Sequence, residues 1–288
     1  MKNKNMINKE VISLKLSYLD LLSPEPVYIK NVGGIISPKL RDVSVLGYDT
    51  YQFYLELLRM DSKKFFSVLG HEEDYDLLSD EEKSNLNMFE LWVANEQSAN
   101  LLKKSLNFFI KEDVLYSNQK KCFMVQNGQE NVGVITRESY SQICDLIFQR
   151  VCTQSGREED LSKAKNKKAL EIAKKLQEGR SQRKKQAKAD KNMDLANIIS
   201  AVANRSPSLN ILNIWDLTVY QLWDCFSRIS NNNIYEIQAR AVAAWGNKDN
   251  HFDAAAWFKN IFFFQAEDGI RDIIHEILAS IYRRQHGR

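Results

Sequence analysis

The feature that most constrains how this chain can fold is a long basic stretch near its middle that lacks an apolar stripe. Residues 163–191 contain twelve Lys or Arg and three acidic residues, and no large apolar side chain occurs between Leu176 and Met193. Because Ala, Lys, Gln, Glu and Arg are strong helix formers, the stretch can form a solvated helix or a frayed linker, but not a packed core element. We therefore predict two helical subdomains joined by a long basic helix or linker.

The charge of the chain is distributed unevenly around this stretch. The stretch carries a net charge of +9, whereas the whole chain carries +3, so the remainder carries −6. A hydrophobic content of 44% with 27% charged residues is ordinary for a globular protein and excludes a wholly disordered chain. We predict four segments: a mainly helical N-terminal domain with small β-hairpins (residues 10–155), a basic helical linker (156–192), a Trp-rich helical subdomain (193–261) and a non-native tail (262–288).

Apolar periodicity in the first half indicates mainly α structure interrupted by short strand pairs. The spacing of Tyr51, Tyr54, Leu55 and Leu58 follows one face of a helix, and Ser79 to Glu82 has the pattern of a capping box that opens another helix. The remaining predictions are a hairpin over 27–36 that turns at Gly33-Gly34, a helix that starts at Ser37-Pro38 and stops at Gly47, a helix through Leu102, Leu106 and Phe109, strands over 121–126 and 132–135, and a helix from Tyr140 to Val151.

The C-terminal segment is also predicted to be helical. Val219, Leu222, Trp223, Phe226 and Ile229 form a strong apolar stripe. The run Asn231–Asn233 is predicted to break this helix, and a second helix is predicted from Ile234 to Trp245, where Gly246 ends it.

A search for catalytic, cofactor and metal motifs finds none. The chain lacks a P-loop, a dinucleotide-binding glycine motif, a nucleophile elbow and a zinc-binding His pair. His71 to Asp74 could bind a cation, but an exposed acidic loop is the favoured interpretation. Cys144 and Cys152 lie on an apolar stripe and are interpreted as small buried side chains, and the wide spacing of all four cysteines suggests reduced thiols. We therefore expect no enzyme activity, no cofactor and no metal.

The sequence does not suggest secretion or membrane insertion. No apolar run approaches the roughly 20 residues of a membrane-spanning helix, and the first ten residues do not resemble a secretory signal. We expect no membrane partner.

The basic stretch has two interpretations. Clustered Lys and Arg bind phosphates by releasing counterions, which favours nucleic-acid binding. The stretch lacks interleaved aromatic side chains and the rest of the chain is acidic, which favours a solvated linker or a protein-contact surface. The candidate basic surface consists of Lys174, Lys175, Arg180, Arg183, Lys184, Lys185 and Lys188.

Aromatic residues crowd the C-terminal segment. Large aromatic side chains anchor protein interfaces, although a small helical subdomain also uses them to build a core from few residues. The two interpretations are compatible if one face stays open. The candidate partner-binding residues are Trp215, Tyr220, Trp223, Trp245 and Trp257.

The end of the chain contains a segment of unusual sequence. Residues 265–272, Gln-Ala-Glu-Asp-Gly-Ile-Arg-Asp, match the translation of a flow-cell adapter oligonucleotide used in short-read sequencing, and Phe262–Phe264 would be encoded by a run of T. The alternative is a natural Phe-rich helix with an acidic first turn. We interpret residues from Phe262 onward as non-native and exclude them from the fold argument.

Several motifs resemble a group of proteins from tailed phages and prophages of Gram-positive bacteria. The resemblance extends to about Asn260. It rests on Ser17–Leu22, Val27–Gly33, Ile36–Asp42, Gly47–Tyr51, Asn213–Leu222, Ala243–Asn247, Phe252-Asp253 and Trp257-Phe258. It implies a non-catalytic factor of the tail morphogenesis region, similar to tail assembly chaperones that hold the tape-measure protein before the tube forms.

The resemblance and the basic stretch give two functional hypotheses. In the first, the protein binds phage tail proteins, such as the tape-measure or tube protein, in the cytoplasm of the bacterial host. In the second, it binds nucleic acid through residues 163–191. The sequence leaves the oligomeric state open.

Overall fold

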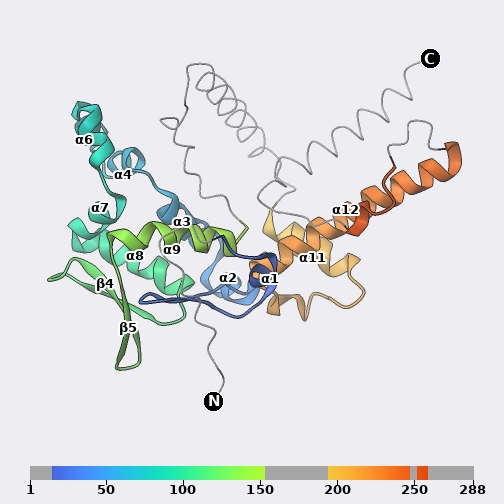
Figure 1. The fold of residues 1–288 in the computed structure, drawn as a ribbon, viewed down its shortest axis with the longest axis horizontal. Coiled ribbons are helices and arrows are strands. Elements are labelled where there is room, and N and C mark those ends of the chain that lie inside the picture. Colours follow the sequence, from blue (N-terminus) through green and yellow to red (C-terminus); the bar gives the residue numbers. More distant parts are fainter. Residues whose placement is uncertain (1–14, 153–193, 247–251, 259–288) are drawn as a thin grey trace. The chain divides into compact units, whose positions relative to one another are not determined.

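The computed structural model describes residues 15–152, 194–246 and 252–258. The chain divides into two compact units, residues 1–191 and residues 192–288 (Figure 1). Helices predominate, and the strands form one antiparallel sheet of two strands and another of three. The predicted mainly α fold with small β-hairpins is confirmed.

The first unit is a set of short helices around a core formed by its longer ones. Leu102, Leu106 and Phe109 are fully buried, as their spacing predicts, and the stripe that begins at Tyr51 also faces the core. The helices are α1 (Tyr18–Leu22), α2 (Leu40–Leu46), α3 (Tyr48–Arg59), α4 (Ser62–Val68), α5 (Glu72–Leu77), α6 (Asp80–Asn85), α7 (Met88–Ala94), α8 (Glu96–Phe109) and α9 (Arg137–Arg150).

Two antiparallel sheets complete this unit. Strands β1 (Val27–Ile29) and β2 (Gly33–Ile35) form the predicted hairpin. Strands β4 (Cys122–Asn127) and β5 (Glu130–Ile135) were also predicted, whereas β3 (Asp113–Ser117), which pairs with β4, was not. The backbone N–H of Lys111 donates to the carbonyl of Gly34 at 2.9 Å, so the chain after α8 extends the smaller sheet.

The position of the first hairpin turn differs from the prediction. The turn lies at residues 30–32, where Asn31 has a φ of 62°, and Gly33-Gly34 belong to β2. Asn tolerates the left-handed conformation that this turn needs. Gly34 serves close packing instead, because a Cβ there would lie 3.0 Å from the ring of Tyr28. Gly33 has a φ of 118°, a conformation that favours glycine, whereas Gly34 is favoured by close packing within the strand.

Helix α2 starts later than predicted. Its N-cap is Lys39, whose backbone N–H donates to the carboxylate of Asp42 at 3.1 Å. The Ser37 hydroxyl does not cap this helix but donates to the carbonyl of Arg150 at 2.7 Å. The predicted end at Gly47 is confirmed.

The second unit contains α11 (Leu195–Arg205), α12 (Val219–Trp245) and two short 3-10 helices, η3 (Ile214–Asp216) and η4 (Ala256–Phe258). The predicted break at Asn231–Asn233 is wrong, because α12 runs through all three residues. Asn231 donates to the carbonyl of Ala256 at 2.9 Å, and Asn233 accepts from Arg205 at 3.2 Å. These tertiary hydrogen bonds outweigh the modest helix propensity of Asn.

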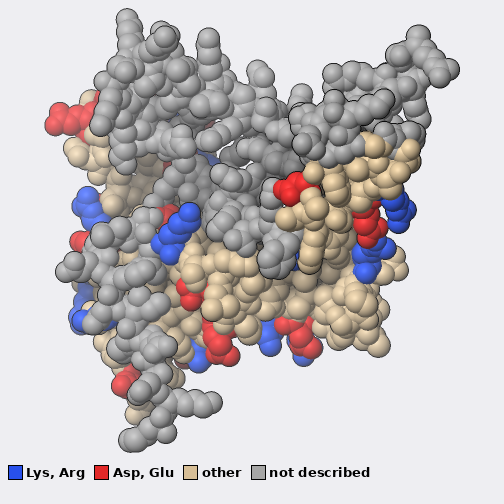
Figure 2. Space-filling view, turned by 45° about the vertical axis from the view of Figure 1, so that its right-hand side comes forward, with Lys and Arg blue, Asp and Glu red and all other residues tan. Residues whose placement is uncertain are grey.

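None of the helices within the described ranges has the length and apolar content needed to cross a bilayer. Lys, Arg, Asp and Glu are scattered among uncharged residues on the described part of the face shown in Figure 2.

Candidate protein-binding surface

The second unit is built on the packing of α11 against α12. The Asp194 carboxylate caps α11 by accepting the N–H of Asn197 at 2.7 Å. The apolar side of α11 is buried through Ile198, Ile199 and Val202. An amphipathic helix fixed in this way supplies a firm support for its neighbour.

Helix α12 is anchored at its start and near its middle. A capping box joins Thr218 and Gln221: the N–H of Gln221 donates to the Thr218 hydroxyl at 3.1 Å, and the N–H of Thr218 donates to the Gln221 side chain at 2.9 Å. Further along, the Arg205 guanidinium donates to Asn233 and lies 3.8 Å from the Glu236 carboxylate. The end of α11 is therefore tied to the middle of α12.

The segment that contains η4 packs on the same long helix. The Asn231 side chain holds the carbonyl of Ala256, and the rings of Tyr235 and Phe252 lie 5.5 Å apart. Trp257, within η4, remains 51% exposed. An indole held on a packed support but open to solvent is typical of an interface anchor.

The predicted aromatic residues occupy different environments. Tyr220 is only 1% exposed and so belongs to the buried part of the chain, whereas Trp215 and Trp223 are half-buried. The Trp215 indole N–H donates to the carbonyl of Ile211 at 2.7 Å, and Trp223 contacts Phe226 edge-to-face at 6.1 Å. The side chain of Trp245 lies outside the described residues. Among these five, Trp257 has the most open described side chain.

The distal half of α12 carries apolar side chains on a face that is open to solvent. Ile234, Ile237, Ala241 and Ala244 follow one another at intervals of three, four and three residues, so they share one helix face. Ile237 is 53% exposed, Ala244 is exposed, and the other two are half-buried. This spacing is that of a seam that packs against another helix.

A second apolar feature lies in the loop between α11 and η3. The Asn210 side chain accepts the N–H groups of Leu212 and Asn213, at 2.8 and 3.2 Å, and the Asn213 side chain accepts the N–H of Asn210 at 2.7 Å. This loop presents Ile211 and Leu212 to solvent, and Leu212 is 83% exposed. These hydrogen bonds fix the conformation of the loop, and its two aliphatic side chains are exposed to solvent.

The candidate basic surface cannot be placed. All seven of its residues, Lys174, Lys175, Arg180, Arg183, Lys184, Lys185 and Lys188, lie outside the described residues.

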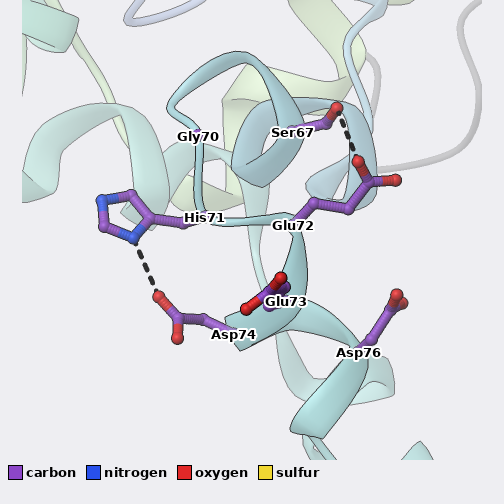
Figure 3. Close-up of a pocket in the computed structure, with 7 residues that line it drawn as sticks. All are labelled: Ser67, Gly70, His71, Glu72, Glu73, Asp74 and Asp76. Atoms are coloured by element: carbon purple, nitrogen blue, oxygen red, sulfur yellow. Dashed lines mark hydrogen bonds and ion pairs between the residues drawn. The ribbon is translucent and has the colours of Figure 1, made fainter.

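The acidic segment predicted as a loop begins a helix. His71 precedes α5, and Glu72, Glu73 and Asp74 form its first turn, where carboxylates are favoured by the helix dipole. They line an open hollow of about 490 Å³ (Figure 3). His71 Nδ1 lies 2.8 Å from Asp74, and the Ser67 hydroxyl donates to Glu72 at 3.4 Å. These contacts stabilise the exposed N-terminal end of α5.

The described residues contain no grouping suited to catalysis by a metal. Within the described ranges, no three His, Cys, Asp or Glu side chains are arranged to hold a metal ion. All four cysteines are free thiols, and Cys122 and Cys144 are buried. Burial raises the pKa of the half-buried Cys225, which keeps that thiol protonated and weakly nucleophilic.

Sequence patterns missed the exposed aliphatic pair Ile211 and Leu212. The available signal was their position between two asparagines, which bond readily to nearby backbone groups and favour structured turns. Periodicity did indicate Ile234 and Trp245 as helical, but it could not show that the distal half of α12 lies open.

Comparison with protein families gives a match over the residues of this surface. Residues 184–262 match the family model described as the YomV second domain, a family of Bacillus phage and prophage type. No curated protein and no solved structure matches the chain. The second unit is thus similar to a phage-related domain over α11, α12 and η4.

Proposed function

We propose that this protein is a non-catalytic phage assembly factor that binds a structural protein of the phage through its second unit. The observation that carries the proposal is the exposure of Ile237 and Trp257 on a helical support that is capped and tied at several points. We use the name α12 surface for two sets of side chains: Ile234, Ile237, Ala241 and Ala244 on one face of α12, and Trp257 in η4, which packs on the same helix.

Rigid support is what makes exposed apolar groups useful for binding. Burial of apolar area stabilises a complex, while ordering flexible segments costs free energy. Because α12 is already fixed by Thr218, Arg205 and Asn231, little further ordering is needed there when a partner binds.

The proposed partner is a protein of the phage tail. The similarity to the YomV second domain supports a phage-related role for the second unit. The resemblance of motifs in both halves to tail morphogenesis proteins favours the tape-measure or tube protein as the partner. The proposed site of action is the cytoplasm of the bacterial host, where tails assemble.

The proposed absence of catalysis follows from the chemistry of the described residues. General acid–base or nucleophilic catalysis requires a group in a suitable environment with an orienting neighbour. The hollow beside α5 is an open acidic helix end whose carboxylates lie at the surface. Such an arrangement offers no sheltered reaction site.

The proposal is tested by measuring binding of the full chain to the tape-measure and tube proteins encoded by the same phage genome. Ile237→Ser and Trp257→Ala are expected to weaken binding about 30-fold each, the effect of losing roughly 2 kcal/mol at an interface anchor. Gln238→Ser is the matched control, because this exposed neighbour of Ile237 does not belong to the α12 surface. Circular dichroism first checks that each variant is folded.

Two results would contradict the proposal. One is wild-type protein that binds neither tail protein. The other is a pair of folded variants, Ile237→Ser and Trp257→Ala, that bind as tightly as the Gln238→Ser control.

Nucleic-acid binding is the second candidate, favoured by the twelve basic residues of 163–191. Phosphate binding weakens steeply with salt, whereas an apolar interface does not. Replacing Lys184, Lys185 and Lys188 by Gln should then reduce the dependence of DNA affinity on salt concentration. If the wild type shows no measurable DNA affinity at low salt, this candidate is excluded.

A further inference from the structure

We propose that residues 16–26 of the first unit form a strap that opens and closes as one piece, with Arg150 as its clasp. The inference goes beyond the proposed function, because it concerns a conformational change in the first unit. The strap contains α1 and the proline-containing connection to β1.

Four hydrogen bonds join the strap to two consecutive residues at the end of α9. The Arg150 guanidinium donates through Nη1 to the carbonyls of Asp20 and Ser23, at 2.6 and 3.0 Å, and through Nη2 to the carbonyl of Glu25 at 2.8 Å. The Gln149 side-chain oxygen accepts the N–H of Leu16 at 2.9 Å. These four hydrogen bonds are therefore concentrated at the end of α9.

Arg150 is suited to this task by its chemistry and its position. Its residue exposure is 0%, and its rigid fork of donors matches several carbonyls at once in a way that a Lys ammonium does not. Burial lowers the pKa of Arg150 to about 10, so the guanidinium is charged at neutral pH. The carbonyls of Asp20 and Ser23 also belong to the C-terminal end of α1, where a cation is favourable.

The strap adds little to the core of the unit. Its buried side chains are Leu16 and Leu21, whereas Pro24 and Pro26 have no N–H to bond to the rest of the fold. The core around Leu102, Phe109 and Ile147 is formed by residues outside the strap. Segments with few buried apolar contacts open at a lower free-energy cost than the core does.

The strap is bounded at one end by β1, and the clasp lies at the end of α9. From Val27 onward the chain is paired with β2, which sets the limit of the opening. Arg150 is the last residue of α9, and Cys152, two residues later, has a φ of 55° that departs from the helix. Release of the Arg150 side chain therefore frees the strap and exposes Leu16 and Leu21 as a switchable apolar surface.

Native-state hydrogen exchange of the full chain, followed by mass spectrometry, tests the strap. In the wild type we expect amides within 17–25 to exchange at least about 10-fold faster than those of α8 and β4, which open only when the unit unfolds. Arg150→Met, which keeps an aliphatic side chain but removes the donors, should speed exchange in 17–25 by a further ~10-fold or more and leave α8 and β4 unchanged. Arg137→Met is the matched control, because Arg137 lies on the same helix but pairs with the exposed Glu90 at 2.7 Å.

If Arg150→Met does not fold, the hydrogen exchange of the wild type still tests the strap. Gln149→Ala then replaces Arg150→Met as the variant. Gln149→Ala should raise exchange at Leu16 and across 17–25 without affecting β4. The proposal is overturned if wild-type strap amides exchange at the same rate as those of α8, or if the variants accelerate exchange uniformly over the unit.

Discussion

At the scale of single residues, the sharpest constraint on the first unit is the space available at Gly133. This β5 residue faces the turn of the first hairpin, and the N–H of the next residue, Val134, donates to the carbonyl of Asn31 at 2.9 Å. A Cβ on Gly133 would lie 2.0 Å from that same carbonyl oxygen. Neither backbone can yield without breaking the contact between the two sheets.

Gly133→Ala should therefore lower the free energy of unfolding of the first unit by about 3 kcal/mol or more, at the upper end of the usual cost of overpacking. Denaturant titration measures the loss. Gly70→Ala is a useful control, since a Cβ there meets nothing within 4 Å and tests only the cost of a positive φ, about 1 kcal/mol. Equal losses for the two variants would show that the contact with Asn31 is unimportant.

Ser227, on α12, is a position where substitution by Ala is expected to stabilise the fold. Its hydroxyl is buried and has no hydrogen-bond partner among the described residues. Since an unsatisfied buried hydroxyl destabilises the fold and Ala is the better helix former, Ser227→Ala should stabilise the second unit by about 1 kcal/mol.

Thermal unfolding checks this expectation, with Ser230→Ala, at a half-buried position, giving the gain from helix propensity alone. A loss of stability in Ser227→Ala would mean that the hydroxyl has a partner in solution.

At the scale of elements, local sequence patterns were sufficient to predict a helix or strand whose structure depends only on its own residues. The capping box at Ser79 and Glu82, the stop at Gly47 and the stripe through Leu102 are all present. The failures occurred where another element intervenes. The hairpin turn depends on what packs beside Gly34, and α12 continues past Asn231 because α11 and η4 supply hydrogen bonds.

The α6 capping box leads to a pH prediction. Hydrogen bonds from the backbone N–H and hydroxyl of Ser79 lower the pKa of Glu82 below its ordinary value of 4.5. Because the ionised form is the one stabilised, its contribution is complete above pH 4.5 and is lost as the pH falls through the lowered pKa.

Carbon-13 NMR titration of the Glu82 carboxyl should give a midpoint below its ordinary value of 4.5. Ser79→Ala should return the midpoint of Glu82 to the ordinary range. A Glu82 midpoint that is the same in the wild type and in Ser79→Ala would exclude the capping box in solution.

At the scale of the whole molecule, the division into two units was the most accessible property from the sequence, whereas the binding surface was not. The thinning of apolar residues before Met193 marks the change of unit. In contrast, Trp257 and Tyr220 are equally aromatic in the sequence, and only tertiary packing leaves one exposed and buries the other. Arg150 gave no local signal, because its partners lie more than a hundred positions earlier.

Two units imply two unfolding events. Calorimetry of the full chain should show two transitions, with Gly133→Ala lowering the midpoint of one and Ser227→Ala raising that of the other, because substitutions at distant sites act independently. A single transition shifted by both variants would show that the units unfold as one.

The clasp at Arg150 also determines the order in which the first unit is completed during synthesis. Its hydrogen bonds join residues separated by 125 to 130 positions, and such contacts require the closure of a very long loop. The strap is among the first described segments to leave the ribosome, yet its fastening residue emerges only after every other described element of the unit. Throughout that interval the strap lacks the hydrogen bonds of Gln149 and Arg150, so the nascent chain carries an unfastened end that binding factors of the cell can reach.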